Sequence, residues 1–573
     1  MDENTENKKT VYRRSMRHTK KNFHTIASKA EEDDSREYDE NYRFDREKLS
    51  RSYRRSNLGK EDDFEEDYSE DGDKYGKYDS YEEEESPAFV RSSFFANSFS
   101  HLQLLILSVL LSLSFYSFPL FNRVATGSAA VSLYSGFAMN HGVTPYNEFF
   151  GSSGPLFYFV NQIGAATGST LILWLCEVIA LWASGIAAFD ILQEMLRNKV
   201  LSTVIGAAAI LAIAGISMGG DQAIIFALPF AFYGVRVLNR YFMDDEAVRD
   251  EVFILFGIAG ALASLFFPLF LVIWLLGFLG LFGRNIALRN FGRGFYQLLC
   301  GLFGFLLVFS LAGYYTLTTQ IFYPTIEQAV IIPFTHLNLS VSGAIHLAIS
   351  LGLILLFGLL ASWFNGFYYV ANGNHRVWTF VLLIAGMLSL VVVSFMQGYS
   401  PAYALVILPF AFMYAGLLLD REAFSGQNDR QRTLGQTFSK YLRATAFLPV
   451  LGLIFLLVFP IANNMYHSSY ISSEKSVAAY VKKNSAASDQ VTVLADSLEI
   501  NRLSKRSSDV TMPPSYYPAS YSKALSVNIS TSSSKLIVVD DAVKIPDSLK
   551  VVLDSKYAAV KFNNSHFKIY QLK

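Results

Sequence analysis

An acidic side chain beside two aromatic residues is the best candidate for chemistry in this chain: Glu148 is followed by Phe149 and Phe150. It belongs to a polar segment, residues 121–167, that is punctuated by Gly and Pro and lies between two very apolar segments. A carboxylate held where a membrane meets water could take a proton from a hydroxyl group. It could equally cap the loop or remain a solvated charge, and both interpretations stay open.

A second acid, Asp221, follows Gly219 and Gly220 and comes directly before an apolar run. This position makes it a second candidate for catalysis, although an acid at the start of a helix can also simply cap the free N–H groups there. Gln397 and Tyr399 lie in another turn between apolar runs, where they could contact a sugar or a phosphate.

The elements that must position these residues are set by hydropathy. The chain has 573 residues, 51% of them hydrophobic, but they fall into three unlike regions. Residues 1–96 are polar and charged and are predicted to be a disordered cytoplasmic tail. Residues 97–465 repeatedly offer apolar runs of about 18 to 22 residues, enough to cross roughly 30 Å of hydrocarbon. Residues 466–573 predict a small α/β domain, so the fold class is a polytopic α-helical membrane protein.

The apolar runs predict about eleven membrane spans. They cover residues 98–120, 168–190, 199–217, 222–241, 252–267, 268–283, 295–318, 342–364, 377–396, 401–419 and 444–464. The fifth and sixth form one apolar stretch broken only by Pro268, and a re-entrant pair is the alternative there.

Charge predicts the orientation. Lys and Arg gather in the connections that are cytoplasmic if the N-terminus is cytoplasmic, for example residues 284–294 and 420–443. The connections on the other side carry almost none, Arg123 being the exception. We therefore expect a multi-pass protein of the plasma membrane with an extracellular C-terminal domain. Nothing in the sequence indicates binding to nucleic acid.

Within the first outer loop, residues 128–141 predict an amphipathic helix lying in the membrane interface, with Val131, Tyr134, Phe137 and Ala138 on its apolar side. A second interfacial helix is expected to begin at Pro155, because proline is favoured at the first helical position. The stretch between them reads "GVTPYNEFFGSSGPLFYFVNQIG".

This stretch resembles the first-loop signature of the C-type (GT-C) membrane glycosyltransferases, the enzymes related to protein O-mannosyltransferases and aminoarabinose transferases. Gly142, Pro145, Tyr146, Glu148 and Tyr158 fill places of that signature. "GGDQAIIFALPFAFY" at 219–233 and "YALVILPFAFMYAG" at 403–416 are similar to later spans of the family. The resemblance covers most of residues 98–573.

The resemblance implies transfer of a sugar from a polyprenyl-phosphate donor to a surface protein or wall polymer outside the cytoplasm. It implies a base, for which Glu148 or Asp221 is the candidate, and an apolar groove for the prenyl chain. A divalent metal is possible but no ligand set is evident. The residues expected to contact the substrate are Arg123, Tyr146, Asn147, Tyr158, Gln397 and Tyr399.

The family's usual first-loop acid is not matched. It stands about fourteen residues before the glycine of the Pro-Tyr motif, a place that Ser128 fills here. Residues 264–270 likewise lack the lysine that members often carry near the lipid phosphate. Three interpretations follow: an active enzyme with another base, a catalytically silent subunit that binds a lipid-linked sugar, or a transporter of lipid-linked glycans.

The C-terminal region predicts a helix at 473–484 and strands at 491–494, 536–539, 558–562 and 567–571. The resemblance suggests that this domain covers the active face or helps to select the acceptor.

Overall fold

The fold was analysed in a computed structural model. The structure describes residues 97–573 apart from gaps at 121–123, 197, 244–248, 373–375, 397, 425–438, 440–441, 444, 446–447, 496, 509–526, 528, 544 and 546. The predicted tail, residues 1–96, lies outside the described residues.

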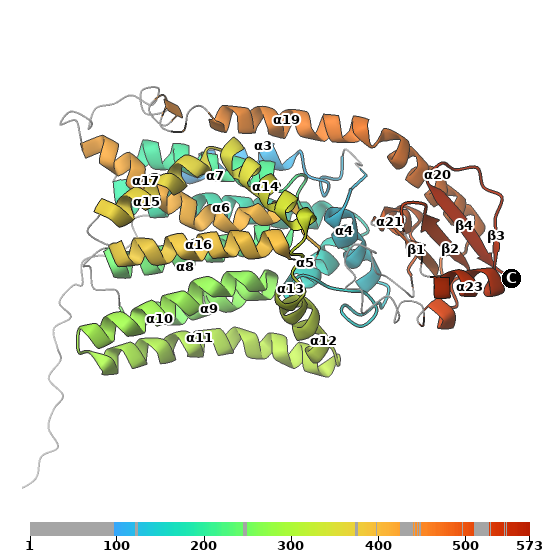
Figure 1. Cartoon of the computed structure of the whole chain (residues 1–573), viewed down its shortest axis with the longest axis horizontal. Helices are drawn as coiled ribbons and strands as arrows, with labels where there is room; N and C mark the ends of the chain where they lie inside the picture. Colours follow the sequence, from blue (N-terminus) through green and yellow to red (C-terminus); the bar gives the residue numbers. More distant parts are fainter. Residues whose placement is uncertain are drawn as a thin grey trace, which may run out of the picture. The chain divides into compact units, whose positions relative to one another are not determined.

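A bundle of long apolar helices forms the larger part of the described chain (Figure 1). Seven helices in this part are long and apolar enough to cross a membrane, or eight if one bent pair counts as a span. The seven are α6 (Leu171–Leu196), α7 (Lys199–Ile216), α8 (Ala223–Met243), α10 (Leu271–Ala287), α11 (Phe291–Thr318), α16 (Arg376–Phe395) and α19 (Leu448–Tyr466). They bury every backbone group within the helix, as a lipid environment requires.

Shorter apolar helices occupy the remaining predicted spans. They are α3 (Ser98–Ser112), α9 (Val252–Phe266) and the continuous η3 (Pro401–Ile407) and α17 (Leu408–Phe424). At the Pro268 break α9 and α10 are separate helices, joined through the short η1 (Pro268–Phe270). Phe267 is extended there because the residue before a proline avoids the helical region. Each predicted span contains apolar helix, but α3 ends at Ser112, well before the predicted end at 120. The count of eleven spans stays a prediction, because seven or eight helices in the described chain are long enough to cross a membrane.

A sharp bend lies elsewhere than the sequence suggested. The predicted span 342–364 is two helices, α14 (Val341–Leu356) and α15 (Leu359–Asn372), that meet at 92°. Gly358 between them has φ +75°, a conformation that favours glycine. Phe357 is buried in the bundle core beside it.

Several connections meet at one end of the bundle, which we call the loop end: residues 124–167, 217–222, 319–340 and 398–400. The first contains α4 (Ser128–Met139) and α5 (Pro155–Ala165), which begins at the expected proline. The third contains α12 (Phe322–Ile326), η2 (Glu327–Ile331) and α13 (Ile332–Thr335). Figure 1 places α4, α5, α12 and α13 at the same end.

The C-terminal domain is a four-stranded mixed sheet with helices. Its strands are β1 (Val491–Leu494), β2 (Leu536–Asp540), β3 (Tyr557–Ala559) and β4 (Phe567–Leu572), in the order β1-β2-β4-β3. β1 and β2 are parallel and the other two pairs are antiparallel. The described helices are α20 (Ser468–Asn484), α21 (Glu499–Ser504) and α23 (Asp547–Lys556).

The expected interfacial position of α4 is wrong in one respect. Tyr134 and Ala138 do not face lipid but are buried in one apolar cluster with Val477 and Val481 of α20. The Tyr134 hydroxyl also accepts a hydrogen bond of 2.9 Å from the backbone N–H of Ser508. The apolar side of α4 is therefore covered by the C-terminal domain, which removes it from water as effectively as lipid would.

Candidate functional site

The signature turn of the first loop is held by side chains from its own loop and from η2. Tyr146 is buried, has φ +65°, and donates from its hydroxyl to the Ser153 carbonyl over 2.7 Å. The Gln328 side chain donates to the Tyr146 carbonyl over 2.7 Å and accepts from the Gly151 N–H over 2.9 Å. The Tyr158 ring is buried edge-to-face against Tyr146, with centroids 5.5 Å apart. Burial raises the pKa of the Tyr146 phenol, so it stays neutral.

Two of the predicted site residues in the first loop, the contact residue Asn147 and the candidate base Glu148, lie on the surface. Asn147 and Glu148 are both exposed, and the Glu148 carboxylate accepts a hydrogen bond from the backbone N–H of Thr144. This contact is the loop cap that the sequence left open as an alternative. A catalytic role for Glu148 is not tested by the geometry and stays a prediction.

Asp221, which belongs to the loop end, is fully buried. Its carboxylate accepts from the Asn161 amide over 3.2 Å, and its backbone N–H donates to the Glu177 carboxylate. The Ser117 hydroxyl donates to the same glutamate. Burial raises the pKa of the Asp221 carboxyl above its usual range. These contacts join α5, α6 and the turn before α8; the catalytic role predicted for Asp221 stays untested.

The residue after Asp221 faces a different direction. The side-chain nitrogen Nε2 of Gln222 donates to the Ser128 hydroxyl over 2.9 Å. The Ser400 hydroxyl donates to the side-chain oxygen Oε1 of Gln222 over 3.4 Å. Ser128 and Ser400 are also in hydrogen-bond contact at 3.5 Å. We call Ser128, Gln222 and Ser400 the neutral triad. Ser128 is the position where the resemblance expects an acid, so an uncharged hydrogen-bonded network stands in its place.

The neutral triad lines a polar cavity of about 440 Å³ at the loop end. His346 of α14 and Tyr399 line it as well, together with Asn338 and Asn463. Tyr399 is thus the one predicted contact residue that the structure places at this cavity within the described chain. Arg123 and Gln397, the other predicted contacts in turns, lie outside the described residues.

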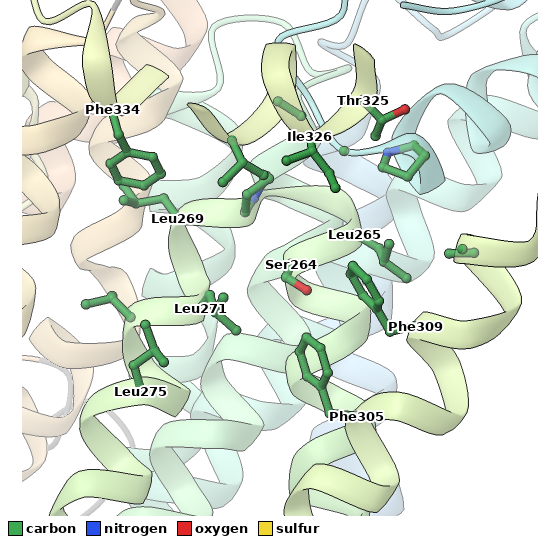
Figure 2. A pocket seen from close by; sticks show the side chains of 18 of the residues that line it. Ser264, Leu265, Leu269, Leu271, Leu275, Phe305, Phe309, Thr325, Ile326 and Phe334 are labelled. Atoms are coloured by element: carbon green, nitrogen blue, oxygen red, sulfur yellow. The ribbon is translucent and has the colours of Figure 1, made fainter. Parts of the chain in front are cut away.

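An apolar groove of about 570 Å³ lies between α9, α10, α11 and α12. Figure 2 shows Leu271 and Leu275 of α10 on one side and Phe305 and Phe309 of α11 on the other. Thr325 and Ile326 of α12 close its loop end in the same view. Ser264 supplies one of the few polar atoms along this otherwise hydrocarbon wall.

The groove and the polar cavity are neighbours. Gly154 and Pro155 line the groove, and the preceding Ser153 lines a small pocket that Ser128 and Gln222 also line. The signature turn thus contributes residues to both the apolar groove and the small pocket beside the neutral triad.

Positive charge and metal ligands are sparse here. Among the described residues that line the polar cavity there is neither Lys nor Arg. A further cavity of about 330 Å³ is lined by Lys475 of α20 and shares Met218, Phe459 and Asn463 with the polar cavity. No group of three or more His, Cys, Asp or Glu side chains in the described residues is placed to hold a metal ion.

Sequence reasoning missed His346 and the partners of Ser128. His346 lies in a strongly apolar run, and a single polar residue there was not weighed. An ionisable side chain inside a predicted span is the signal that could have found it.

The helix bundle with its two-helix first loop is similar in fold to two crystal structures of ArnT. The crystal structure of ArnT from Cupriavidus metallidurans bound to undecaprenyl phosphate matches with a TM-score of 0.52 at 12% identity, covering 83% of this chain and 98% of that chain. Its apo state matches with a TM-score of 0.51 at 12% identity, over 84% and 98%. The Archaeoglobus fulgidus oligosaccharyltransferase complex with Zn and sulfate gives 0.46 at 11% identity, over 82% and 72%.

The chain belongs to the Competence-induced Ccs4 family. The N-terminal domain of that family matches residues 92–469, and its C-terminal domain matches residues 471–573. No curated protein matches the chain.

Proposed function

We propose that this protein is a membrane glycosyltransferase that moves a sugar from a polyprenyl-phosphate donor to a surface protein or wall polymer. The observation that carries the proposal is an apolar groove that reaches the loop end, where the polar cavity also lies. A polyprenyl-phosphate sugar has the same division, with a hydrocarbon chain at one end and hydroxyl groups at the other. The undecaprenyl phosphate bound to ArnT, a protein of similar fold, is a lipid of this class.

The donor phosphate needs a positive partner as the bond to the sugar breaks. Lys475 lines the cavity of about 330 Å³ that adjoins the polar cavity. Arg123 is the residue immediately before the described part of the first loop. We propose these two cations as the phosphate contacts. The neutral triad supplies hydroxyl and amide groups of the kind that hydrogen-bond sugars.

We place the loop end on the outer side of the plasma membrane, with the N-terminus in the cytoplasm and the C-terminal domain outside. The distribution of Lys and Arg among the connections supports this orientation. The acceptor then meets the donor at the surface where wall polymers and exported proteins are found.

A second candidate function has one specific observation in its favour. The expected acid is replaced by Ser128, whose partners Gln222 and Ser400 are also uncharged. A catalytically silent subunit that holds a lipid-linked sugar without transferring it would need hydrogen-bonding groups at this place but no carboxylate.

The test uses the full-length protein in lipid nanodiscs with a polyprenyl-phosphate hexose as donor. A Ser/Thr-rich peptide and a glycerol-phosphate oligomer serve as acceptor probes, while donor binding and release of the lipid phosphate are measured separately. Turnover with either acceptor supports transfer. Tight donor binding without turnover across several hexoses contradicts transfer and supports the silent subunit.

Two variants, Glu148→Gln and Asp221→Asn, test the predicted acids in the same assay. Because neither carboxylate lines the polar cavity, we expect donor turnover within about twofold of wild type if both residues act only in structure. A loss of about 100-fold or more in either variant, with donor binding intact, would instead assign that residue as the base.

A further inference from the structure

The polar cavity lacks the group that transfer to a hydroxyl normally requires. Among the described residues that line it there is no Asp or Glu, and two side chains can titrate: His346 and Tyr399. Glu148 is bound to its own loop, and Asp221 is buried against Asn161. His346 and Tyr399 are therefore the candidates for the base among the described residues that line the polar cavity.

The Tyr399 hydroxyl is already engaged away from the neutral triad. It shares a hydrogen bond of 2.8 Å with the Ser350 hydroxyl, which in turn accepts from Ser394 over 3.3 Å. Its ring lies flat on the His346 ring, with centroids 4.3 Å apart and planes 10° apart. Tyr399 therefore fixes the plane of the imidazole, as a support placed behind a reacting group would.

His346 is half-buried in the second turn of α14. Its Nδ1 is buried and has no hydrogen-bond partner among the described residues. Nε2 is not among the buried unpartnered atoms, and His346 lines the polar cavity. The imidazole shares that cavity with the neutral triad, where a sugar and an acceptor hydroxyl would meet.

We propose that His346 is the general base of the transfer reaction, an inference that rests on the proposed function. The acceptor oxygen forms a bond to the anomeric carbon of the sugar while the bond from that carbon to the phosphate oxygen breaks. The hydroxyl proton passes to the His346 ring, and the lipid phosphate leaves with the electron pair. The imidazolium then returns its proton to water, so the histidine is regenerated.

None of the described residues that line the polar cavity with His346 carries a fixed charge. The other polar groups that line the cavity, all uncharged, are Thr126, Ser128, Ser217, Gln222, Asn338, Tyr399, Ser400 and Asn463. Among these groups the imidazole is the one suited to accept a proton from an acceptor hydroxyl.

The experiment compares wild type, His346→Gln and the matched control His141→Gln in nanodiscs. His141 is an exposed histidine of the first loop that lines none of the cavities described above. We expect His346→Gln to lose about 100-fold or more of the turnover while donor binding and melting temperature stay near wild type. The control should keep its turnover.

Rescue provides a second readout that a structural role would not give. In His346→Ala, added imidazole should restore part of the turnover, whereas it should not affect Glu148→Gln. Full turnover in His346→Gln would overturn the assignment and leave the proposed function standing. A wild-type protein that binds donor without ever transferring it overturns the proposed function, and the assignment falls with it.

Discussion

Glu474 is an acid buried in the C-terminal domain, on α20. A hydrogen bond from the Ser497 side chain favours its charged form, but burial outweighs this effect. Burial raises the pKa of Glu474 to about 8, and the nearby Glu499 and Asp540 add to the rise. The protonated form is therefore the one that suits the folded domain.

This carboxyl makes stability depend on pH in a definite direction. Because its folded pKa lies above the unfolded value of about 4.3, the folded state gains from protonation, and the gain is lost as the pH rises through about 8. We expect Glu474→Gln to flatten the decline of melting temperature between pH 5 and pH 9, each kcal/mol counting for about 2 to 4 °C. Asp547→Asn, at an exposed acid, is the control. Parallel curves for wild type and Glu474→Gln would contradict the prediction.

The sequence identified Glu148 and Asp221 as the acids worth testing, because both stand beside apolar runs. It could not indicate that Asp221 is enclosed by Asn161 and Glu177, since those residues lie far away along the chain. The neutral triad was equally out of reach, because Ser128 and Ser400 are 272 positions apart. The sequence shows the type of each residue, but it does not show which distant residues lie beside it in the fold.

Among the elements, α5 and α9 approach each other closely at Gly154 and Leu265, which both line the apolar groove. A Cβ on Gly154 would lie 2.0 Å from the Leu265 carbonyl oxygen, which belongs to the backbone of α9 and cannot turn aside. The φ of Gly154 is −70°, which any residue adopts, so the requirement for glycine is purely one of space.

Gly154→Ala should push α5 away from α9 and destabilise the protein by about 1 to 3 kcal/mol. Because Gly154 and Leu265 both line the apolar groove, donor binding should weaken as well. Gly283→Ala in α10 is the matched control, since no atom lies within 4 Å of its added Cβ. Thermal unfolding and donor binding are the measurements, and a Gly154→Ala protein equal to the control would refute this account.

The helices themselves were predictable from apolar runs, because hydrocarbon enforces both their length and their composition. The bend at Gly358 was not, since a glycine inside an apolar run is compatible with a straight span. The burial of α4 was also missed, because an apolar helix face does not tell whether lipid or protein will cover it.

For the whole molecule, the orientation in the membrane is the proposal that the rest depends on. We expect a cysteine at position 148 to react with an impermeant maleimide added outside intact cells, and a cysteine at position 430 to react only after the cells are opened. Cys176 and Cys300 are replaced in both variants so that labelling reports the new thiol alone. Labelling of position 430, and not of 148, from outside would reverse the assignment.

Helix α4 reaches from the polar cavity to the core of the C-terminal domain. The first residue of α4, Ser128, lines the polar cavity, and one and a half turns later Tyr134 is embedded in the core of the soluble domain. The twelve residues of α4 make a rod of about 18 Å. A displacement of the C-terminal domain would therefore be transmitted along α4 to Ser128 at the polar cavity.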